Sequence, residues 1–447
     1  MSEFKIIRRH ASTVLVGQLA TMAYGVTDTI VAGRYSEASL AALSVGAAIY
    51  MSVYVGLLGV LQALLPAWSE LHGAKRPEAL GHSFRQALYL WLALVAVGLL
   101  ALLQPGLLLD WADIPPQLRG EVLLYLDVLA LALPAAMLFR LYSTLNQSLG
   151  KPQLVTWLQL GSIFVKLPLS LWFTFGGLGL DPQGAVGCAW ATLLVHLVLL
   201  AVAAWLLRTR PLYAPYQLWQ WPGRPDWKVL GIFARVGIPS GLTILVEVTS
   251  FTLMALFVAR LGTAAAASHQ IAANLAAVLY MVPLAIGIAC SARTSYWLGA
   301  GQPDRARHAV AVGAGLVVAC ALLLAGALAL LRMPLAQLYA DSPEVIALAA
   351  SLLRWTAAYH LFDGLQALGV FVLRCFRITL TPFVIYGVLL WGLGLYGGYV
   401  LAYQGLGPWP ALRRPDAFWM AGAAALALAA LTFWLMIWQV LRRDQRS

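Results

Sequence analysis

Three carboxylic acids, Asp28, Glu247 and Asp363, lie within long apolar segments that otherwise carry almost no charge. A carboxylate at the depth of a membrane is costly unless it is protonated, paired or facing water. Buried carboxylates can bind protons, metal cations or cationic molecules. The three acids are therefore the first candidates for a functional site.

Glu247 and Asp363 lie near the middle of two apolar segments in the second half of the chain. Their similar depth predicts that they face each other. Two carboxyl groups in a desolvated site titrate as a coupled pair. Such a pair suits a proton or a monovalent cation, and Na⁺ favours oxygen ligands. The alternative is a pair of protonated, hydrogen-bonded acids with a structural role only.

Lys166 is a cation within an apolar segment of the first half, which also contains Asp28. A rise of about 1.5 Å per residue along each helix places the two side chains within a few ångströms in depth. We hypothesise an ion pair between Asp28 and Lys166 whose breaking is part of the functional cycle. The alternative is that Lys166 extends to a membrane interface.

Polar and aromatic residues near the acids are candidates for the lining of a cleft. His269 and Gln270 follow an alanine run, where they are either polar groups of the cleft or structural hydrogen-bond partners, and structure is the better reading for His269. Aromatic rings can bind an organic cation by cation–π attraction. The candidate cleft-lining residues are Gln270, Asn274, Tyr280, Phe251 and Gln366.

The elements that position these residues are membrane spans. The chain has 447 residues, of which 61% are hydrophobic and 11% are charged, whereas a soluble domain is about a quarter charged. Apolar windows of about 20 residues predict twelve transmembrane helices. They begin near Ala11, Ser39, Phe84, Val122, Gln153, Ala185, Phe233, Ala264, His308, Ile346, Thr379 and Asp416.

The positions of the basic residues exclude a nucleic-acid partner, although the formal net charge is +11. Most Lys and Arg residues lie in the loops on one side of the predicted spans, together with both termini, and few lie in the opposite loops. This asymmetry predicts that both termini are cytoplasmic. The N-terminus has no small-residue cleavage site before the first span, so we expect a retained first helix.

The two halves of the chain resemble each other. Residues 73–78 (GAKRPE) follow the second span and residues 299–304 (GAGQPD) follow the eighth. This repeat predicts an all-α membrane protein of two six-helix bundles, residues 1–207 and 232–447. A cytoplasmic linker, residues 208–231, would join them. A cleft at a repeat interface is common among transporters.

Motifs of nucleotide-driven or metal-dependent enzymes are missing from the sequence. It contains no Walker loop, no dinucleotide glycine fingerprint and no His-Glu-x-x-His. We therefore expect a transporter rather than an enzyme, with energy from an ion gradient and no cofactor other than the coupling ion. A membrane-embedded enzyme remains the alternative from another functional class.

Several segments make the chain resemble the multidrug and toxic compound extrusion (MATE) family, most closely its NorM-like bacterial branch. They are residues 25–33 with 40–44, 247–249, 268–274 and 363–366. The resemblance implies a twelve-helix, two-lobed fold and efflux of cationic, amphipathic compounds in exchange for Na⁺ or H⁺. It also implies that Glu247 and Asp363 form the second-lobe cation site, and that Asp28 is the functional acid of the first lobe.

The chain departs from the family pattern in two places. Lys166 and Ser170 stand where the family commonly has asparagines, which argues against a metal cation in the first lobe. Residues 374–377 (RCFR) replace the usual turn after the tenth span.

The expected protein is a monomer in the bacterial inner membrane, with the lipid bilayer and small organic cations as its partners. A flippase for lipid-linked oligosaccharides, from the wider superfamily, is the rival within transport. Its cleft should carry many basic residues for pyrophosphate.

Overall fold

The computed structural model describes residues 2–106, 116–177, 179–408 and 410–443. Within these ranges, twelve helices are long and apolar enough to cross a membrane. The predicted number of spans is therefore confirmed. Several helices begin earlier than the apolar windows suggested, because charged and polar residues extend their first turns.

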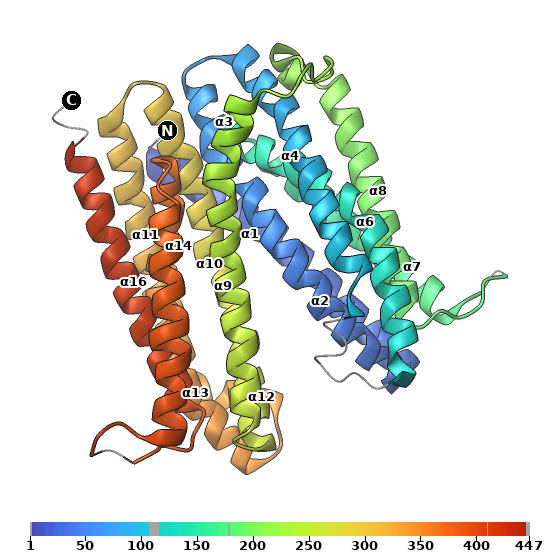
Figure 1. Ribbon diagram of the computed structural model, residues 1–447, viewed down its shortest axis with the longest axis vertical. Coiled ribbons are helices and arrows are strands. Elements are labelled where there is room, and N and C mark those ends of the chain that lie inside the picture. The colour runs from blue at the N-terminus through green and yellow to red at the C-terminus, as the bar shows by residue number, and fades with distance from the viewer. Residues whose placement is uncertain (1, 107–115, 178, 409, 444–447) are drawn as a thin grey trace. The chain divides into compact units, whose positions relative to one another are not determined.

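The helices of the first half and the linker are shown in blue to light green in Figure 1. Their bounds are α1 Glu3–Tyr35, α2 Glu37–Gln62, α3 Leu64–Gly73, α4 Pro77–Leu103, α6 Pro116–Ser148, α7 Gln153–Phe175, α8 Ala185–Thr209 and the 3₁₀ helix η1 Pro211–Tyr216.

The second half contains the remaining spans and a segment of wide helical turns. Its bounds are α9 Trp227–Ala259, α10 Thr263–Gly299, α11 Pro303–Leu330, α12 Arg332–Tyr339, α13 Pro343–Cys375, α14 Leu380–Gly387, the π-helix η2 Val388–Tyr396, α15 Gly397–Tyr399, the π-helix η3 Val400–Gln404 and α16 Asp416–Arg443. α14 to η3 together form the eleventh span.

Close packing divides the chain into two compact units. The N-terminal unit comprises residues 16–241, and the C-terminal unit comprises residues 1–15 and 242–447. The predicted bundles, 1–207 and 232–447, place these boundaries elsewhere. They differ because the first turns of α1 pack with the C-terminal unit and the first half of α9 packs with the N-terminal unit.

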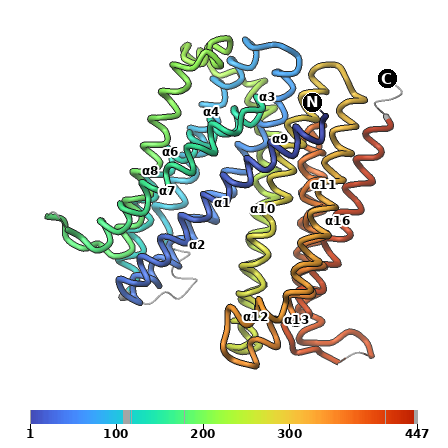
Figure 2. Tube along the Cα trace, turned by 180° about the vertical axis from the view of Figure 1, so that it is seen from behind, coloured from blue at the N-terminus to red at the C-terminus, as the bar shows by residue number. Residues whose placement is uncertain are grey.

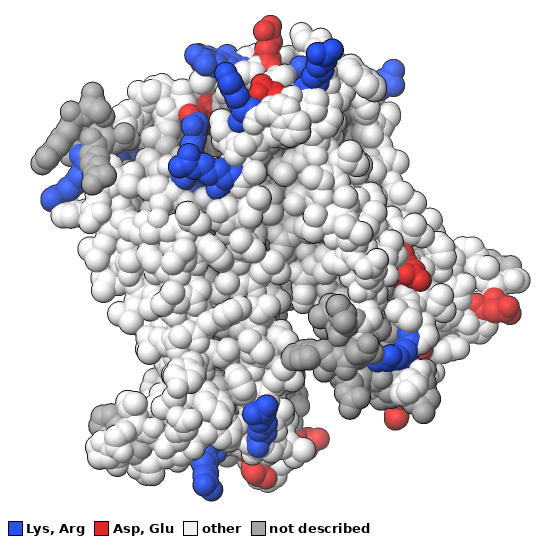
Figure 3. Space-filling model, in the orientation of Figure 1, with Lys and Arg blue, Asp and Glu red and all other residues white. Residues whose placement is uncertain are grey.

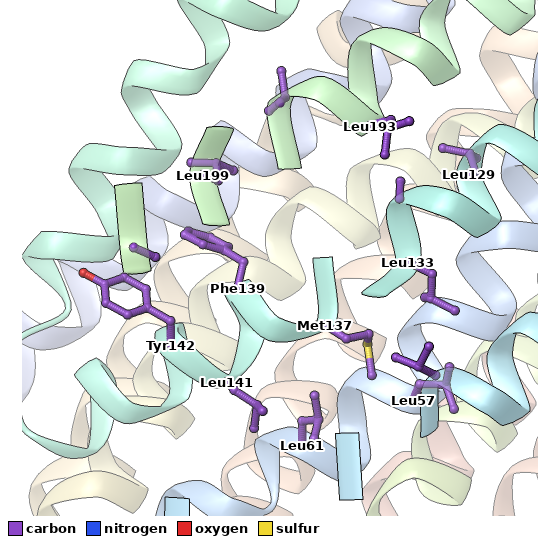
Figure 4. Packing of buried hydrophobic residues seen from close by; sticks show 14 of the residues in the cluster. Leu57, Leu61, Leu129, Leu133, Met137, Phe139, Leu141, Tyr142, Leu193 and Leu199 are labelled. Carbon is purple, nitrogen blue, oxygen red and sulfur yellow. The ribbon is translucent and has the colours of Figure 1, made fainter. Parts of the chain in front are cut away.

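The core of the N-terminal unit is built around α6, which packs against α2, α4 and α8. Figure 4 shows Leu57 and Leu61 of α2 near Met137 of α6, and Leu193 of α8 near Leu129 of α6. α6 is largely apolar around its circumference, as expected of a helix enclosed by others. The C-terminal unit has an equivalent centre in α13, which packs against α10, α11 and α16.

The repeated turn predicted from the sequence has the same geometry in both units. Lys75 after α3 and Gly301 after α10 both adopt a left-handed conformation, with φ of 54° and 69°. In each case the following helix begins with a proline, Pro77 or Pro303, at a position where a missing N–H costs nothing. The internal repeat is therefore visible in the backbone as well as in the sequence.

The linker is tied to the start of α4. The amide of Gln86, which is fully buried, donates to the carbonyls of Pro222 and Arg224 (3.1 Å each) and accepts from the N–H of Asp226 (2.8 Å). A Cβ atom on Gly81 would lie 1.7 Å from the carbonyl oxygen of Tyr216, so only glycine fits there. The linker is therefore a packed part of the N-terminal unit.

Asp226 caps α9, whose first turn occupies residues that the sequence assigned to the linker. Its carboxylate accepts from the backbone N–H groups of Lys228 (3.0 Å) and Val229 (3.3 Å). These N–H groups, that of Val229 above all, hold the pKa of the Asp226 carboxyl below its ordinary value. Trp227 is therefore the first helical residue of α9.

Charged side chains and the chain termini lie at the ends of the C-terminal unit. The beginning of α1 and the end of α16 lie at the same end of this unit (Figure 2), as an even number of crossings requires. On the face shown in Figure 3, charged side chains lie toward the two ends of the C-terminal unit and the band between them is uncharged. Such a band suits contact with lipid chains.

Candidate functional site

An ion pair lies inside the N-terminal unit between α1 and α7. The ammonium nitrogen of Lys166 is 2.8 Å from the Asp28 carboxylate, and the two side chains are 1% and 10% exposed. The predicted pairing is therefore confirmed, and the alternative that Lys166 extends to an interface is wrong. Breaking of the pair during a functional cycle stays a prediction.

The remaining hydrogen bonds of Lys166 are made to α8. Its ammonium donates to the carbonyl of Cys188 (2.9 Å) and to the hydroxyl of Thr192 (2.6 Å). Thr192 in turn donates to the same carbonyl (2.9 Å). An ammonium has three N–H donors, and all three have acceptors here, so the buried charge is well compensated.

Ser170 completes this cluster because it lies four residues after Lys166, on the same face of α7. Its hydroxyl donates to the Asp28 carboxylate (3.1 Å). The two residues that depart from the family pattern are thus the two that hold Asp28. A buried ion pair is tolerated when further hydrogen bonds satisfy its remaining polar atoms, and this pair meets that condition.

The second cluster lies in the C-terminal unit and contains Glu247 of α9 and Asp363 of α13. The two carboxyl groups interact electrostatically, so the structure brings together the acids that the sequence paired. Asp363 is 5% exposed and Glu247 is partly buried. Within the described residues, neither acid forms a salt bridge.

An amide and several phenols surround these acids. Gln366 of α13 donates to Asp363 (2.9 Å) and to the hydroxyl of Tyr386 of α14 (3.3 Å). Tyr280, Tyr359 and Tyr386 all lie within electrostatic range of both carboxyl groups. The site can therefore offer several oxygen atoms to a small cation, or hold protons on its carboxylates.

Other predicted cleft residues have different surroundings. Gln270 and Asn274 are exposed on α10, where the amide of Gln270 donates to Asn274 (3.2 Å). Phe251 packs edge-on against Tyr359 and Trp419, with ring centres 5.9 and 6.2 Å away. It also lines a cavity of about 20 Å³ in the C-terminal unit, large enough for about one water molecule.

His269 has the structural role that the sequence favoured. Its ring nitrogen accepts from the indole N–H of Trp419 (3.2 Å), and the side chain is 3% exposed. A pair of this kind satisfies two buried polar atoms without a ligand.

Three contributors to the two clusters were missed in the sequence. Thr192 and Tyr386 lie on helices distant in sequence from the acids, and only packing reveals their contacts. Arg374, at the end of α13, is 4% exposed, and two of its guanidinium nitrogens have no hydrogen-bond partner among the residues that the structure describes. It interacts electrostatically with Glu247. In the sequence it stood out only as part of residues 374–377, which replace the usual turn after the tenth span.

Comparison with known proteins places this architecture in a family. The MatE family profile matches residues 14–172 and 239–400. The chain is 38% identical over 452 residues to a probable multidrug resistance protein, NorM, of Aromatoleum aromaticum, covering 99% of this chain and 96% of the relative. It is 32% identical to the multidrug resistance protein PmpM of Pseudomonas aeruginosa, covering 100% of this chain and 93% of the relative.

Solved structures share the fold at low sequence identity. The bent form of the Vibrio cholerae MATE transporter VcmN superposes with a TM-score of 0.84 at 20% identity, covering 99% of this chain and 98% of the other. A transporter of the MOP superfamily from Pyrococcus furiosus gives a TM-score of 0.88 at 17% identity, covering 100% and 98%.

These matches confirm the predicted fold class of twelve membrane helices and the predicted class of protein, a transporter and not an enzyme. The family profile covers most of the chain, and the relatives are matched over nearly their whole length. The chain therefore belongs to the MATE family of integral membrane transporters, in its NorM-like bacterial branch.

Proposed function

We propose that this protein exports cationic, amphipathic compounds in exchange for Na⁺ or H⁺, by alternating access of its two helical bundles. Relatives named as multidrug resistance proteins support the substrate class. The observation that carries the coupling is the contrast in countercharges. Asp28 already has an ammonium at 2.8 Å, whereas Glu247 and Asp363 form no salt bridge within the described residues.

The coupling ion binds at Glu247 and Asp363. Two carboxyl groups in electrostatic contact favour a proton or Na⁺ between them. Gln366 donates to Asp363 and to the hydroxyl of Tyr386, and these hydrogen bonds orient Gln366 toward the acid. The same carboxylates attract a cationic compound. Because they cannot neutralise both ligands at once, binding of the ion drives release of the compound, and no further contact between the ligands is needed.

The Asp28–Lys166 pair has another role in this scheme. The ammonium occupies the position beside Asp28 that a metal cation would need, so Na⁺ does not bind there. Rearrangement of α1 during transport changes the distance between Asp28 and Lys166. The interaction energy of the ion pair therefore depends on the state of the transporter. The ion pair of the N-terminal unit then responds to the conformational state of the transporter, although this unit does not bind the coupling ion.

The protein acts as a monomer in the bacterial inner membrane, with both termini in the cytoplasm. The excess of Lys and Arg in the loops on the side of the termini supports this orientation. A lipid-linked oligosaccharide is a poor cargo for the acids of the C-terminal unit, because they would repel pyrophosphate. The buried Lys166 is already engaged with Asp28.

Ethidium movement in proteoliposomes tests the proposal. The purified protein is reconstituted, and ethidium fluorescence is followed under an imposed Na⁺ gradient or an imposed pH gradient, with ionophores that collapse each gradient as controls. We expect ethidium to move against its gradient under at least one of them. A response to pH alone would remove Na⁺ from the mechanism. Movement under neither gradient would contradict the exporter.

A further inference from the structure

The first helix of the chain belongs to both units. Ile7 and Ala11, which are 0% and 6% exposed, lie in the hydrophobic core of the C-terminal unit. Val31 and Ala32, near the end of the same helix, lie in the core of the N-terminal unit. α1 is continuous between them, and the boundary between the two units falls within this helix, between residues 15 and 16.

The first turn of α1 is fastened to α10 by a bidentate ion pair. Arg293 donates from Nε (3.0 Å) and Nη2 (2.6 Å) to the two carboxylate oxygens of Glu3. The indole N–H of Trp297, one turn further along α10, donates to the same carboxylate (3.1 Å). The side chains of Glu3 and Arg293 are 12% and 17% exposed, so water screens the pair little.

Aromatic stacking reinforces this contact. The guanidinium of Arg293 lies 4.9 Å from the centre of the Trp297 ring, and that of Arg305 lies 4.6 Å from it. Cation–π contacts of this kind orient the ring and the guanidinium groups, so that less side-chain conformational entropy is lost when the ion pair forms. Glu3 also lies in the first turn of α1, where a negative charge favours the helix dipole.

The two ends of α1 are thus held by ion pairs in different units. Glu3 is bound to Arg293 in the C-terminal unit, and Asp28 is bound to Lys166 in the N-terminal unit. The helix rises about 37 Å between Glu3 and Asp28, at about 1.5 Å per residue. When the units move relative to each other, this helix must bend, or one of its two ends must be released.

We propose that Glu3, Arg293 and Trp297 form a latch that fixes the first half of α1 to the C-terminal unit and makes α1 transmit movement to the Asp28–Lys166 pair. The three are positioning residues for transport. This inference rests on the transport proposed above. With the latch closed, movement of the C-terminal unit reaches Asp28 through the helix; with the latch open, the first turns of α1 separate from α10 instead.

Hydrogen–deuterium exchange of the full-length protein in detergent tests the latch without any transport assay. Glu3→Gln keeps the size of the side chain but removes the charge that Arg293 binds. We expect amide exchange in residues 3–15 to become about tenfold faster, as hydrogen bonds to a charged group are lost, while exchange in residues 20–31 is unchanged. Glu37→Gln is the matched control, since Glu37 is an exposed acid in the first turn of α2.

Ethidium transport under the active gradient tests the second part. Glu3→Gln should slow transport several-fold at an unchanged melting temperature, while ethidium binding without a gradient stays as in the wild type. The charge-reversed double variant, Glu3→Arg with Arg293→Glu, should recover part of the slow exchange and part of the transport, since it restores the ion pair but not the stacking on Trp297 or the favourable charge at the start of α1. A purely structural role for the pair predicts lost stability and no selective loss of transport.

Two outcomes would overturn the latch. One is exchange in residues 3–15 of Glu3→Gln that equals the exchange in Glu37→Gln. The other is faster exchange with fully retained transport, which would show that the contact holds α1 but transmits nothing. A wild-type protein that moves no ethidium at all would contradict the transport proposal, and the exchange result would still decide whether the contact fastens α1.

Discussion

The two acid clusters of this transporter solve the problem of a buried carboxylate in different ways. In the N-terminal unit, Asp28 is paired with the ammonium of Lys166 at 2.8 Å and accepts from Ser170 at 3.1 Å. In the C-terminal unit, Asp363 accepts from the amide of Gln366 at 2.9 Å and has the second carboxyl group of Glu247 as its electrostatic neighbour.

This difference predicts a structural role for the Asp28 cluster and a cation-binding role for the Glu247–Asp363 cluster. A carboxylate whose charge is already balanced by the protein has little to gain from an incoming cation. Two carboxyl groups that share a site without a bonded cation remain unfavourable until a proton or a cation arrives. We therefore expect charge removal to destabilise the first cluster and to inactivate the second, and the following predictions test that contrast.

The largest effect is expected in the C-terminal unit. Glu247→Gln or Asp363→Asn should abolish gradient-driven ethidium transport, because the site can no longer bind the coupling ion. The melting temperature should stay the same or rise, since one of two neighbouring acids is removed. Transport in proteoliposomes and thermal unfolding in detergent measure the two effects. Retained transport in both variants would remove these acids from the coupling mechanism.

The next largest effect concerns stability in the N-terminal unit. Lys166→Met leaves Asp28 as an unpaired buried charge and should cost about 3–5 kcal/mol, measured as a lowered melting temperature. The double variant Lys166→Met with Asp28→Asn removes both charges and should recover most of this loss. If the single variant is as stable as the wild type, the ion pair does not compensate Asp28 in the way its geometry indicates.

Gln366 offers a smaller test within the C-terminal site. Gln366→Leu removes the donor to Asp363 and should cost about 1–3 kcal/mol of interaction. If the coupling ion is Na⁺, half-maximal transport should need a higher Na⁺ concentration. If it is H⁺, half-maximal transport should need a lower H⁺ concentration, because the donor favours the charged carboxylate. Gln270→Leu is the matched control, because Gln270 is an exposed glutamine on α10. Equal ion dependence in the two variants would show that Gln366 does not orient the acid.

The smallest effect is expected at Ser170. Ser170→Ala removes one hydrogen bond from a carboxylate that keeps its ammonium, so the loss should be about 1 kcal/mol, with transport retained. Ser52→Ala, which removes a hydroxyl that donates to the carbonyl of Ala48 in its own helix, is the control for thermal unfolding. A loss of transport in Ser170→Ala at full stability would give the N-terminal cluster a direct part in binding and would remove the contrast.

The sequence predicted the fold and the pairs of charged residues, because both depend on depth along helices. A rise of about 1.5 Å per residue converts a position in a span into a depth, which was enough to pair Lys166 with Asp28 and Glu247 with Asp363. Depth says nothing of the rotation of each helix about its axis. The contacts of Thr192, Tyr386 and Arg374 depend on that rotation and appeared only in the structure.

The boundaries between the units could not be predicted for a related reason. Composition marks a linker where charged and proline residues gather, at 208–231, but it does not say which helix a linker packs against. The hydrogen bonds of Gln86 fasten that segment to α4, and the first half of α9 continues in the same unit. A buried glutamine within α4 gave no sign of this in the sequence.

The Gln86 contacts have a consequence for recombining transporters of this family. A chimera that exchanges halves at a polar linker would normally be cut within residues 208–231. Here a cut before residue 222 would separate Gln86 from the carbonyls of Pro222 and Arg224, and a cut before residue 216 would place the carbonyl of another protein's residue against Gly81. A crossover after residue 241, inside α9, would keep the linker together with the surface of α4 on which it packs. The natural module for gene fusion is therefore longer than the bundle it contains.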